Sequence, residues 1–529
     1  MSASAELGEQ HPAGGVGHRV PAGRAALSGL LATALGIGVV ELAAGALGAM
    51  PSLVISVGDT VIDSVPGWLE RAAIAALGTN DKPVLLASIA LVAALLGVGT
   101  GVLAARRFPL GAAAFVLFTA VGVAAGLAAP DASAVLTVLV GLVGAAVGVL
   151  ALHLLLRTAR QEVARREAVP DASPTADRRG FLLLAGATAA AAVTTGVGGW
   201  LLTGRERLTA VRAAIRLPRP FRQAGPVPAG ADLEIPGLTP LFIPNSEFYR
   251  IDTALRVPTI DPAGWQLEVR GMVDRPFTLT YDELMELPQI EADVTLTCVS
   301  NEVGGDLVGN ARWQGVPLRA LLERAGVQQG ATQLLGRSVD GFTAGFPTIT
   351  ALDLEEAMVA VGMNGEPLPA AHGFPARLVV PGLYGYVSAT KWLSAIELTD
   401  WDVDGYWIPR GWAKEGPIKT ASRIDVPRPG SAVAAGRQVI AGVAWAPTRG
   451  IEGVEVRVDD GPWQQAVLAE RLDVDCWRQW YLPWDATPGR HVIAARATDG
   501  AGEVQTDERT PVAPDGASGY PVIEVVVAD

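Results

Sequence analysis

The order of apolar and polar residues divides the chain near residue 204. Residues 27–203 contain long apolar runs, whereas polar and apolar residues alternate over short distances from 204 to 529. A membrane-spanning helix needs about 20 mostly apolar residues. Five segments meet this requirement, at 27–49, 84–104, 109–129, 133–156 and 180–203. The pattern predicts a transmembrane helical region followed by a soluble region.

Arginine positions predict how these helices are oriented. Arg19 and Arg24 precede the first span, Arg106 and Arg107 separate the second from the third, and further arginines from Arg157 to Arg179 lie between the fourth and fifth. The loops 50–83 and 130–132 are acidic or nearly neutral, and 50–82 is expected to contain amphipathic helices. Because positive residues stay inside, we expect a cytoplasmic tail (1–26), a multi-pass plasma-membrane region and an extracytoplasmic soluble region.

The fifth span begins with Arg178-Arg179-Gly180-Phe181, followed by an alanine-rich run. This resembles a twin-arginine export signal, although two further arginines could simply obey the positive-inside rule. The export reading suits a domain that folds around a cofactor in the cytoplasm. With no obvious cleavage site, the span is expected to remain as an anchor.

The soluble region divides into three parts. Residues 204–235 are rich in Pro, Gly and Arg and read as a linker. From 236 to 424, β-like runs alternate with helical patterns, which predicts a mixed α+β domain. The runs are Trp265–Val269, Val294–Thr297 and Arg377–Val380, and the helical patterns are Tyr281–Leu287, Leu318–Ala325 and Leu354–Val361. Residues 425–529 contain β-like segments separated by turns such as Asp459-Asp460-Gly461, which predicts an immunoglobulin-like β-sandwich.

Composition and charge exclude several functions. The chain is 50% hydrophobic with a formal net charge of −13, which argues against a nucleic-acid surface. Cys298 and Cys476 are the only cysteines, so one disulfide between them is the most the sequence allows. Cys-x-x-Cys and His-x-x-x-His motifs are missing, and zinc and iron–sulfur sites therefore lack ligands. Gly97, Gly99 and Gly101 lie inside an apolar segment and predict a helix-packing surface.

The sharpest chemical signal is the cysteine that ends a β-like run. Thr295-Leu296-Thr297-Cys298 is followed by a polar loop that contains Gly304 and Gly305. A cysteine at a strand end can present its sulfur into a cleft, and thiolates suit soft or high-valent metals. Taken alone, the spacing favours a buried, inert cysteine.

Several ordered motifs over about 236–529 resemble the sulfite oxidase family. The Cys298 segment is similar to the family's cysteine loop. Met363–Pro369, His372–Gly382 and Lys391-Trp392 are similar to its pterin-phosphate segment. The resemblance implies one molybdopterin whose dithiolene chelates molybdenum, with Cys298 as the protein ligand to the metal. It also implies a homodimer through 425–529.

The resemblance assigns cofactor contacts to further residues: Asn245, Phe248, Tyr249, Asp340, His372, Arg377, Ser388, Ala389, Thr390 and Lys391. Arg377 offers a planar fork and Lys391 a point charge, which suits a pterin phosphate. His372, taken alone, would more often be a structural histidine. The loop before Lys391 is about one residue longer than in sulfite oxidases, and 388–390 are expected to offer backbone contacts.

Two departures from the sulfite-oxidising branch concern the substrate. Pro244 stands where that branch has an arginine, and Trp412 stands where it has a tyrosine. Tryptophan donates one hydrogen bond but cannot lose a proton as a phenol does. Arg410 remains as an anion contact or, alternatively, as a surface ion pair. The predicted catalytic residues are Cys298, Trp412 and Arg410. Because the arginine and the tyrosine are replaced, sulfite is not the expected substrate.

The sequence therefore predicts a membrane-anchored, extracytoplasmic molybdopterin oxidoreductase that performs oxygen-atom transfer on a small-molecule substrate. The direction stays open, because an S- or N-oxide reductase (acting on methionine sulfoxide, for example) fits equally. A cofactor-free, membrane-tethered binding protein is the alternative of another class. His153 is the one histidine in the predicted spans, whereas a transmembrane b-type haem usually needs two. Electrons are thus expected to pass to a separate carrier or a quinone, and membrane lipid is the other expected partner.

Overall fold

A computed structural model describes residues 20–528 except 48–49, 67–68, 70–72, 74–75, 78–79, 130–131, 169–173 and 203–204. The chain forms two compact units, residues 1–205 and 206–529. Each unit has its own core, and each is described by itself below.

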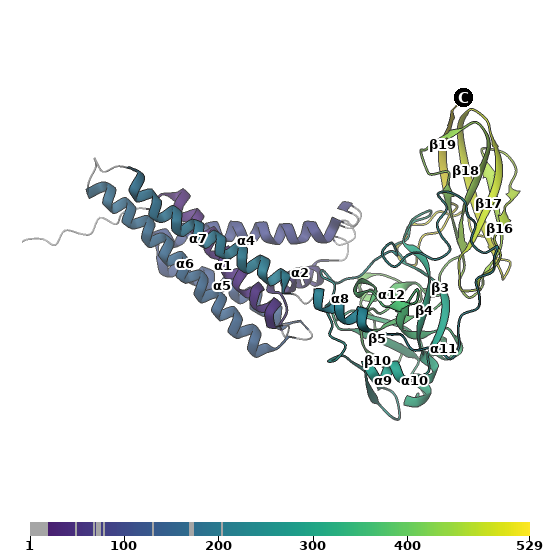
Figure 1. Ribbon diagram of the computed structural model, residues 1–529, viewed down its shortest axis with the longest axis horizontal. Helices are drawn as coiled ribbons and strands as arrows, with labels where there is room; N and C mark the ends of the chain where they lie inside the picture. Colours follow the sequence, from purple (N-terminus) through teal and green to yellow (C-terminus); the bar gives the residue numbers. More distant parts are fainter. Residues whose placement is uncertain are drawn as a thin grey trace, which may run out of the picture. The chain divides into compact units, whose positions relative to one another are not determined.

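The first unit is helical (Figure 1). Its helices are α1 (Ala22–Leu47), α2 (Leu53–Ser64), α4 (Asp81–Arg106), α5 (Phe108–Leu127), α6 (Ala134–Ala168) and α7 (Pro174–Leu201). By length and composition, the described residues contain five helices that could cross a membrane, α2 being too short. Helix α1 packs against α4, α6 and α7.

Glycine allows α1 and α4 to approach closely. A Cβ atom on Gly29 of α1 would collide with the backbone of Gly97 and Gly101 of α4. Small residues at such positions let membrane helices pack backbone to backbone. The predicted packing role is confirmed for Gly97 and Gly101, whereas Gly99 faces open space.

Helix α6 is longer than the predicted span. It continues from residue 156 to Ala168, into the arginine-rich segment between the fourth and fifth predicted spans. Arg, Ala, Gln and Glu are strong helix formers. The change from apolar to polar residues after 156 therefore marks the end of the apolar part of α6 and not the end of the helix. Arg160 donates to the carbonyls of Ala104 and Ala105, both at 3.3 Å, and so satisfies the C-terminal end of α4.

Helix α8 (Arg205–Ala214) begins at the boundary between the two units, inside the segment expected to be a linker, and an α+β domain follows it in the second unit. One sheet has the strand order β3-β4-β7-β8 with β9 on β7, and the other has the order β2-β1-β10-β5-β6. The strands are β1 (Gln266–Gly271), β2 (Phe277–Thr280), β3 (Ile290–Thr297), β4 (Val308–Pro317), β5 (Gln333–Ser338), β6 (Thr343–Pro347), β7 (Met358–Met363), β8 (Glu366–Pro367), β9 (Arg377–Val379) and β10 (Leu393–Thr399). The helices are α9 (Tyr281–Glu286), α10 (Leu318–Ala325), α11 (Thr348–Asp353) and α12 (Gly385–Ser388).

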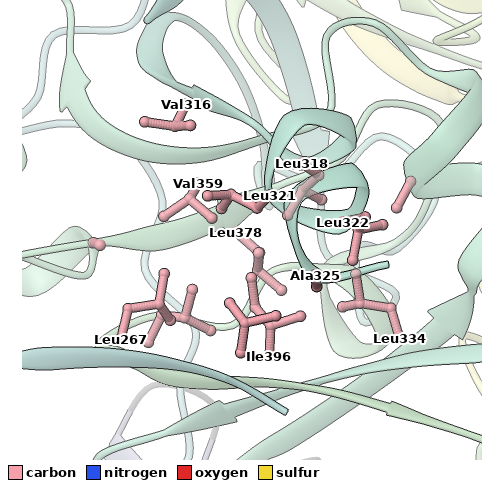
Figure 2. Packing of buried hydrophobic residues seen from close by; sticks show 14 of the residues in the cluster. Leu267, Val316, Leu318, Leu321, Leu322, Ala325, Leu334, Val359, Leu378 and Ile396 are labelled. Carbon is pink, nitrogen blue, oxygen red and sulfur yellow. The ribbon is translucent and has the colours of Figure 1, made fainter. Parts of the chain in front are cut away.

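The two sheets enclose the main hydrophobic core (Figure 2). Leu267 of β1 and Ile396 of β10 lie on one side, and Val359 of β7 and Leu378 of β9 lie on the other. Leu322 of α10 closes the core beside them. Three predicted β-like runs and the predicted helices at 281–287 and 318–325 are present, each within a few residues of its expected bounds.

The predicted helix at Leu354–Val361 is wrong. Helix α11 ends at Asp353, and the apolar residues that follow form β7. Both faces of β7 are buried, because Met358 and Ala360 pack into one core while Val359 and Val361 pack into the other. A strand buried on both sides shows no alternation of polarity, and a short apolar run of this kind cannot be told from a helix by its period.

The C-terminal part is a two-layer β-sandwich. Its sheets have the orders β11-β13-β17-β16 and β12-β19-β18-β14-β15. The strands are β11 (Ala421–Val426), β12 (Ala432–Ala434), β13 (Gly436–Trp445), β14 (Ile451–Val458), β15 (Gln464–Gln465), β16 (Val467–Leu468), β17 (Arg478–Ala486), β18 (Gly489–Asp499) and β19 (Val522–Ala528). Residues from both layers, including Ile440, Trp480 and Ile493, share one core.

Candidate active site

Strand β3 separates two environments. Successive side chains on a strand point to opposite faces. Val294 and Leu296 therefore share one face with Cys298, which directly follows the strand, and we call it the cysteine face. Asp293, Thr295 and Thr297 form the opposite face, which we call the sandwich face because it packs against C-terminal residues.

Cys298 is held at the end of β3 by backbone hydrogen bonds. Its N–H donates to Leu307 O at 2.9 Å, and its carbonyl accepts from Asn301 N at 3.0 Å. Its Sγ accepts from the N–H of Ser300 at 3.4 Å. Burial raises the pKa of the thiol, while the Ser300 hydrogen bonds and the charge of Lys391 lower it. Neither cysteine forms a disulfide, so the one bridge that the sequence allowed is not made.

Arg377 is a buried cation on the cysteine face. Its Nε and Nη1 donate to the carbonyls of Leu378 and His372, both at 3.3 Å, and its guanidinium lies 5.0 Å from the centre of the Trp313 ring. Burial lowers its pKa to about 10. No carboxylate among residues 206–528 pairs with it. A buried charge without an anion is costly, so this position is prepared for a negatively charged group.

Lys391 is buried nearby and does have a partner. Its Nζ lies 2.8 Å from the carboxylate of Asp252, which also accepts from Arg250 Nε at 2.7 Å. Burial lowers the pKa of Lys391 to about 8, against the opposing effect of Asp252. Sequence reasoning missed Arg250 and Asp252. The signal was a charged Arg-Ile-Asp run directly after Phe248-Tyr249.

His372 and Asn245 join this cluster through the backbone. His372 Nε2 lies 3.0 Å from Asn245 O. Burial, and then the charge of Arg377, lower the pKa of His372 to about 4, so the ring is neutral and Nε2–H donates. Asn245 Oδ1 accepts from Asn364 Nδ2 at 2.9 Å.

Phe248 and Tyr249 pack as a stacked pair, with ring centres 5.2 Å apart, and Phe248 meets the His372 ring edge-on at 5.6 Å. Burial raises the pKa of Tyr249. The charge of Cys298 adds to the rise and that of Arg377 opposes it. The structure therefore brings most of the predicted cofactor contacts together around Cys298 and Arg377.

The remaining predicted contacts lie at the edge of the cluster. Asp340, in the turn between β5 and β6, accepts from Phe342 N at 3.1 Å, and burial raises its pKa. Ser388 Oγ donates to Tyr384 O at 3.1 Å, and the N–H of Ala389 donates to Gly385 O at 2.9 Å. Thr390 Oγ1 is buried, with no hydrogen-bond partner among the described residues.

Trp412 and Arg410 belong to an aromatic group rather than to the cationic cluster. The Trp412 ring lies 5.8 Å from Tyr386 and 6.3 Å from Trp407. Arg410 follows in the short turn Ile408–Arg410, with its guanidinium 3.7 Å from the centre of the Tyr406 ring, and it donates to Tyr406 O at 2.8 Å. This group offers flat apolar surface with one cation.

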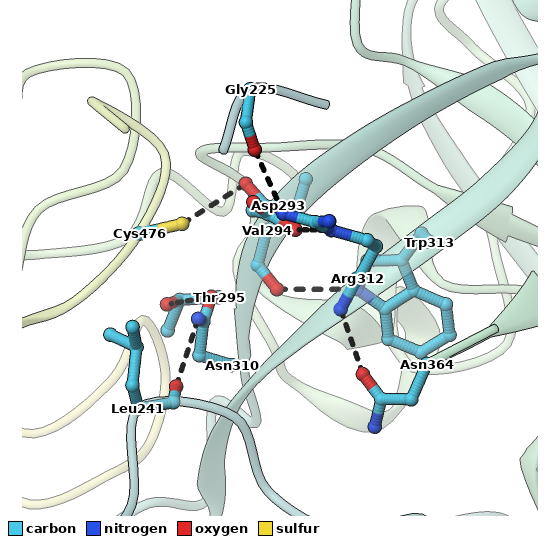
Figure 3. Close-up of polar contacts among 10 residues, drawn as sticks. All are labelled: Gly225, Leu241, Asp293, Val294, Thr295, Asn310, Arg312, Trp313, Asn364 and Cys476. Atoms are coloured by element: carbon cyan, nitrogen blue, oxygen red, sulfur yellow. Dashed lines mark hydrogen bonds and ion pairs between the residues drawn. The ribbon is translucent and has the colours of Figure 1, made fainter. Parts of the chain in front are cut away.

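The sandwich face has a different character (Figure 3). Asp293 receives two hydrogen bonds from Arg312, at 2.7 and 2.8 Å, and its carbonyl accepts from Cys476 Sγ at 3.2 Å. Thr295 Oγ1 donates to Asn310 at 3.1 Å and accepts from Trp477 N at 2.7 Å. These groups are paired with each other and with the C-terminal sandwich, which fixes the strand that carries Cys298.

The cysteine face has the donors for an anionic, metal-bearing group. Cys298 offers one soft sulfur, and Arg377 lacks an anion. In the part of the chain that the structure describes, three or more His, Cys, Asp or Glu side chains never gather as a metal site. A metal bound at Cys298 would therefore need most of its ligands from a cofactor.

Comparisons with known proteins agree with this chemistry. Residues 254–407 match the family model of the oxidoreductase molybdopterin binding domain. The uncharacterized oxidoreductase YuiH of Bacillus subtilis is 35% identical over 156 residues, which are 30% of this chain and 76% of that protein. Human mitochondrial sulfite oxidase is 30% identical over 324 residues, covering 52% of this chain and 59% of that enzyme. The crystal structure of the sulfane dehydrogenase SoxCD from Paracoccus pantotrophus aligns with a TM-score of 0.48 at 24% identity, over 54% of this chain and 81% of that one.

Proposed function

Because the chain belongs to the sulfite oxidase family of molybdopterin-dependent oxidoreductases, we propose that it is a membrane-anchored enzyme that transfers an oxygen atom to or from a small substrate outside the cytoplasm. Membership makes it a molybdenum-dependent oxidoreductase whose cofactor is molybdopterin. When bound, the metal supplies the oxygen-atom and two-electron chemistry. The chain spans 59% of the length of human sulfite oxidase, so its substrate and partners are argued from its own residues.

The observation that carries the proposal is a buried thiol and a buried cation without an anion, both close enough to Tyr249 to shift its pKa. Cys298 would ligate the metal, because thiolate suits such a centre. Arg377 and Lys391 would hold the pterin phosphate. Ser388, Ala389 and Thr390 would contribute backbone contacts. Neutral His372, Asn245, Phe248, Tyr249 and Asp340 would shape the rest of the cofactor site.

We infer that the substrate is larger or less charged than sulfite. Pro244 cannot supply a cation, and Trp412 cannot transfer a proton as a phenol can. Trp412, Trp407 and Tyr386 form an apolar aromatic wall, and Arg410 lies between Trp407 and Trp412 in sequence. An organic sulfoxide suits such a surface, and Arg410 could orient its oxygen.

Membrane attachment rests on the five apolar helices. The arginine clusters on one side of these helices would place the second unit outside the cytoplasm. Electrons would pass to a separate carrier or a quinone, because His153, the one histidine in these helices, packs edge-on against Phe108 at 5.1 Å. The C-terminal sandwich is proposed to be of immunoglobulin type and to mediate dimerisation.

The experiment is elemental and pterin analysis of the purified full-length protein, followed by steady-state kinetics. We expect molybdenum and pterin in equal amounts, and sulfoxide reduction with a reduced dye that exceeds sulfite oxidation with an artificial acceptor. A missing charge-assisted contact is worth roughly 1.5–3 kcal/mol, so sulfite should bind about tenfold to a hundredfold more weakly than it would with that contact. Protein without molybdenum would favour the cofactor-free binding alternative, and efficient sulfite turnover would overturn the substrate proposal.

A further inference from the structure

Asp252 is a buried carboxylate that contacts the buried cation Lys391. Its side chain is 3% exposed and that of Lys391 is 10% exposed, and Lys391 Nζ donates to Asp252 Oδ2 at 2.8 Å. Asp252 lies in an irregular segment that follows Phe248 and Tyr249. A carboxylate repels a phosphate, so its place beside a cation that is proposed to bind one requires an explanation.

The backbone around Lys391 is fixed, whereas its ammonium is carried on a long, flexible stem. The backbones of Thr390 and Leu393 are each tied to strand β9 or the residue before it by a hydrogen bond of 2.9 Å. The four-carbon stem of lysine can still place its head group in many positions. The contacts of Nζ among the described residues are Asp252 at 2.8 Å and the Trp392 ring, whose centre is 4.7 Å away. Asp252 therefore decides where the ammonium lies.

Gly373 shows that the side chains of Lys391 and Arg377 start next to each other. Its φ is +108°, and a Cβ atom added to it would lie 3.0 Å from Arg377 Cβ and 3.1 Å from Lys391 Cβ. The two cationic side chains thus leave the backbone on either side of one glycine. This geometry allows both head groups to reach the same phosphate group.

Arg250 fixes the carboxylate from the outer side. Its Nε donates to Asp252 Oδ2 at 2.7 Å and its Nη2 donates to Oδ1 at 3.4 Å, and its side chain is 39% exposed. A planar guanidinium that contacts both carboxylate oxygens restricts their rotation. It also compensates the charge of Asp252, so Arg250, Asp252 and Lys391 together keep one net positive charge. The carboxylate can therefore orient Lys391 without cancelling its attraction for a phosphate.

We propose that Asp252 is a positioning residue that holds the Lys391 ammonium where it meets the phosphate of the cofactor, and that Arg250 holds Asp252 for this purpose. The inference rests on the proposed function, because it takes the cofactor as given. An ammonium has three donors, and Asp252 uses one of them to set the direction of the others. The long side chain is then ordered before the cofactor binds, which lowers the entropic cost of binding.

The charge state of Lys391 supports this role. Burial lowers the pKa of Lys391 to about 8, and the charge of Asp252 and its hydrogen bond oppose that effect. The carboxylate thus helps to keep the ammonium protonated at neutral pH, where a phosphate needs a cation.

The test measures how fast the full-length protein in detergent releases its cofactor, from the pterin and molybdenum that remain bound over time. The variants are Asp252→Asn, Lys391→Met, the combination of the two, and Arg250→Met, which leaves the buried pair intact. The matched control is Asp425→Asn. Asp425 is also a buried carboxylate, 8% exposed and 2.6 Å from Arg423, but it lies in β11, outside the cofactor site and the aromatic wall.

We expect Asp252→Asn and Lys391→Met each to release the cofactor about tenfold faster than the wild type, as the loss of a charge-assisted contact would. Arg250→Met should release it about threefold faster, because a partly exposed ion pair contributes less. The double variant should be no faster than Lys391→Met, since Asp252 acts through that residue. Asp425→Asn should keep the wild-type rate even where its melting temperature falls.

Release at the wild-type rate or more slowly from both Asp252→Asn and Arg250→Met overturns the positioning role. An effect of Asp252→Asn that persists undiminished beside Lys391→Met also overturns it, because Asp252 would then act on the fold as a whole. A variant that folds but is purified without pterin counts as complete release. If Asp252→Asn does not fold, Arg250→Met decides alone. Failure of the proposed function would appear separately, as wild-type protein without pterin and molybdenum.

Discussion

The two faces of β3 bury polar groups in opposite ways. On the sandwich face, Asp293 is paired with Arg312, and Thr295 is paired with Asn310 and Trp477. On the cysteine face, the guanidinium of Arg377 is buried, donates to two carbonyls and lies against the Trp313 ring, with no carboxylate paired to it among residues 206–528. Thr297 is the exception on the sandwich face, since its Oγ1 has no hydrogen-bond partner among the described residues.

This difference teaches which buried groups serve structure and which serve a ligand. Native proteins pair nearly all their buried polar groups, so a network that closes on itself explains its own presence. A buried cation without an anion destabilises the fold unless something else binds it. The cysteine face therefore indicates a cofactor site independently of any motif.

The largest expected effects are on the paired side, at Arg312 and at Asp475. Arg312→Met would leave the buried carboxylate of Asp293 without its partner and should reduce the stability of the protein by about 3 kcal/mol. Thermal unfolding of the full-length protein in detergent measures the loss. Asp293→Asn combined with Arg312→Met should recover most of it. A single variant as stable as the wild type would contradict the structural role of the pair.

Asp475 tests the same face through pH. Its backbone carbonyl accepts from Thr295 N at 3.0 Å, and its carboxylate accepts from Thr448 N at 2.8 Å. Burial raises its pKa to about 7, with the charges of Asp473 and Glu356 adding to the rise. The folded state therefore holds a proton that the unfolded chain releases near its ordinary value of 3.8.

Stability from this group is present below pH 4 and is lost as the pH rises through about 7. Asp475→Asn should remove this loss. The free energy of unfolding of the variant, relative to that of the wild type, should therefore rise by roughly 4 kcal/mol at most between pH 4 and 8. Melting temperatures measured across that range give the difference. A difference in melting temperature that stays constant from pH 4 to 8 would show that Asp475 does not titrate in that range.

On the cysteine face, Arg377→Met should separate stability from cofactor binding. A charge-assisted bond to a phosphate is worth about 1.5–3 kcal/mol, so cofactor affinity should fall about tenfold to a hundredfold. Cofactor-free protein should be as stable as the wild type or more so, because an unpaired buried charge is gone. Pterin content and melting temperature give the two readouts. The assignment of the two faces would be reversed by two results together: cofactor-free Arg377→Met is less stable than the cofactor-free wild type, and Arg377→Met produced with cofactor keeps its full pterin content.

The smallest effect is expected at the second cysteine. Cys476 Sγ donates to Asp293 O at 3.2 Å, and a serine hydroxyl can make the same bond. Cys476→Ser should change stability by less than about 1 kcal/mol and leave the molybdenum content unchanged. A loss of metal in this variant would mean that the two faces are coupled more strongly than their contacts indicate.

Much of this organisation follows from local sequence. The apolar runs predicted five helices that are long and apolar enough to cross a membrane, because each run is a short continuous stretch. The Cys298 loop indicated the proposed metal ligand for the same reason. The strand β7 was not predicted, since burial on both faces removes the alternation that identifies a strand. The Lys391–Asp252 pair joins residues 139 positions apart, and no local pattern marks such a contact. The pairing of β3 with residues 475–477 escaped prediction for the same reason.

X-ray absorption at the molybdenum edge, compared between the wild type and Cys298→Ser, tests the central claim most directly. Cys298 offers a thiolate on the cysteine face, whereas the other cysteine, Cys476, donates to Asp293 O on the sandwich face. Cys298→Ser should keep its pterin, because Arg377 and Lys391 are intact, and should lose turnover. The account predicts one sulfur fewer around the metal in the variant than in the wild type. The same number of sulfur ligands in both proteins, or normal turnover in Cys298→Ser, would contradict it.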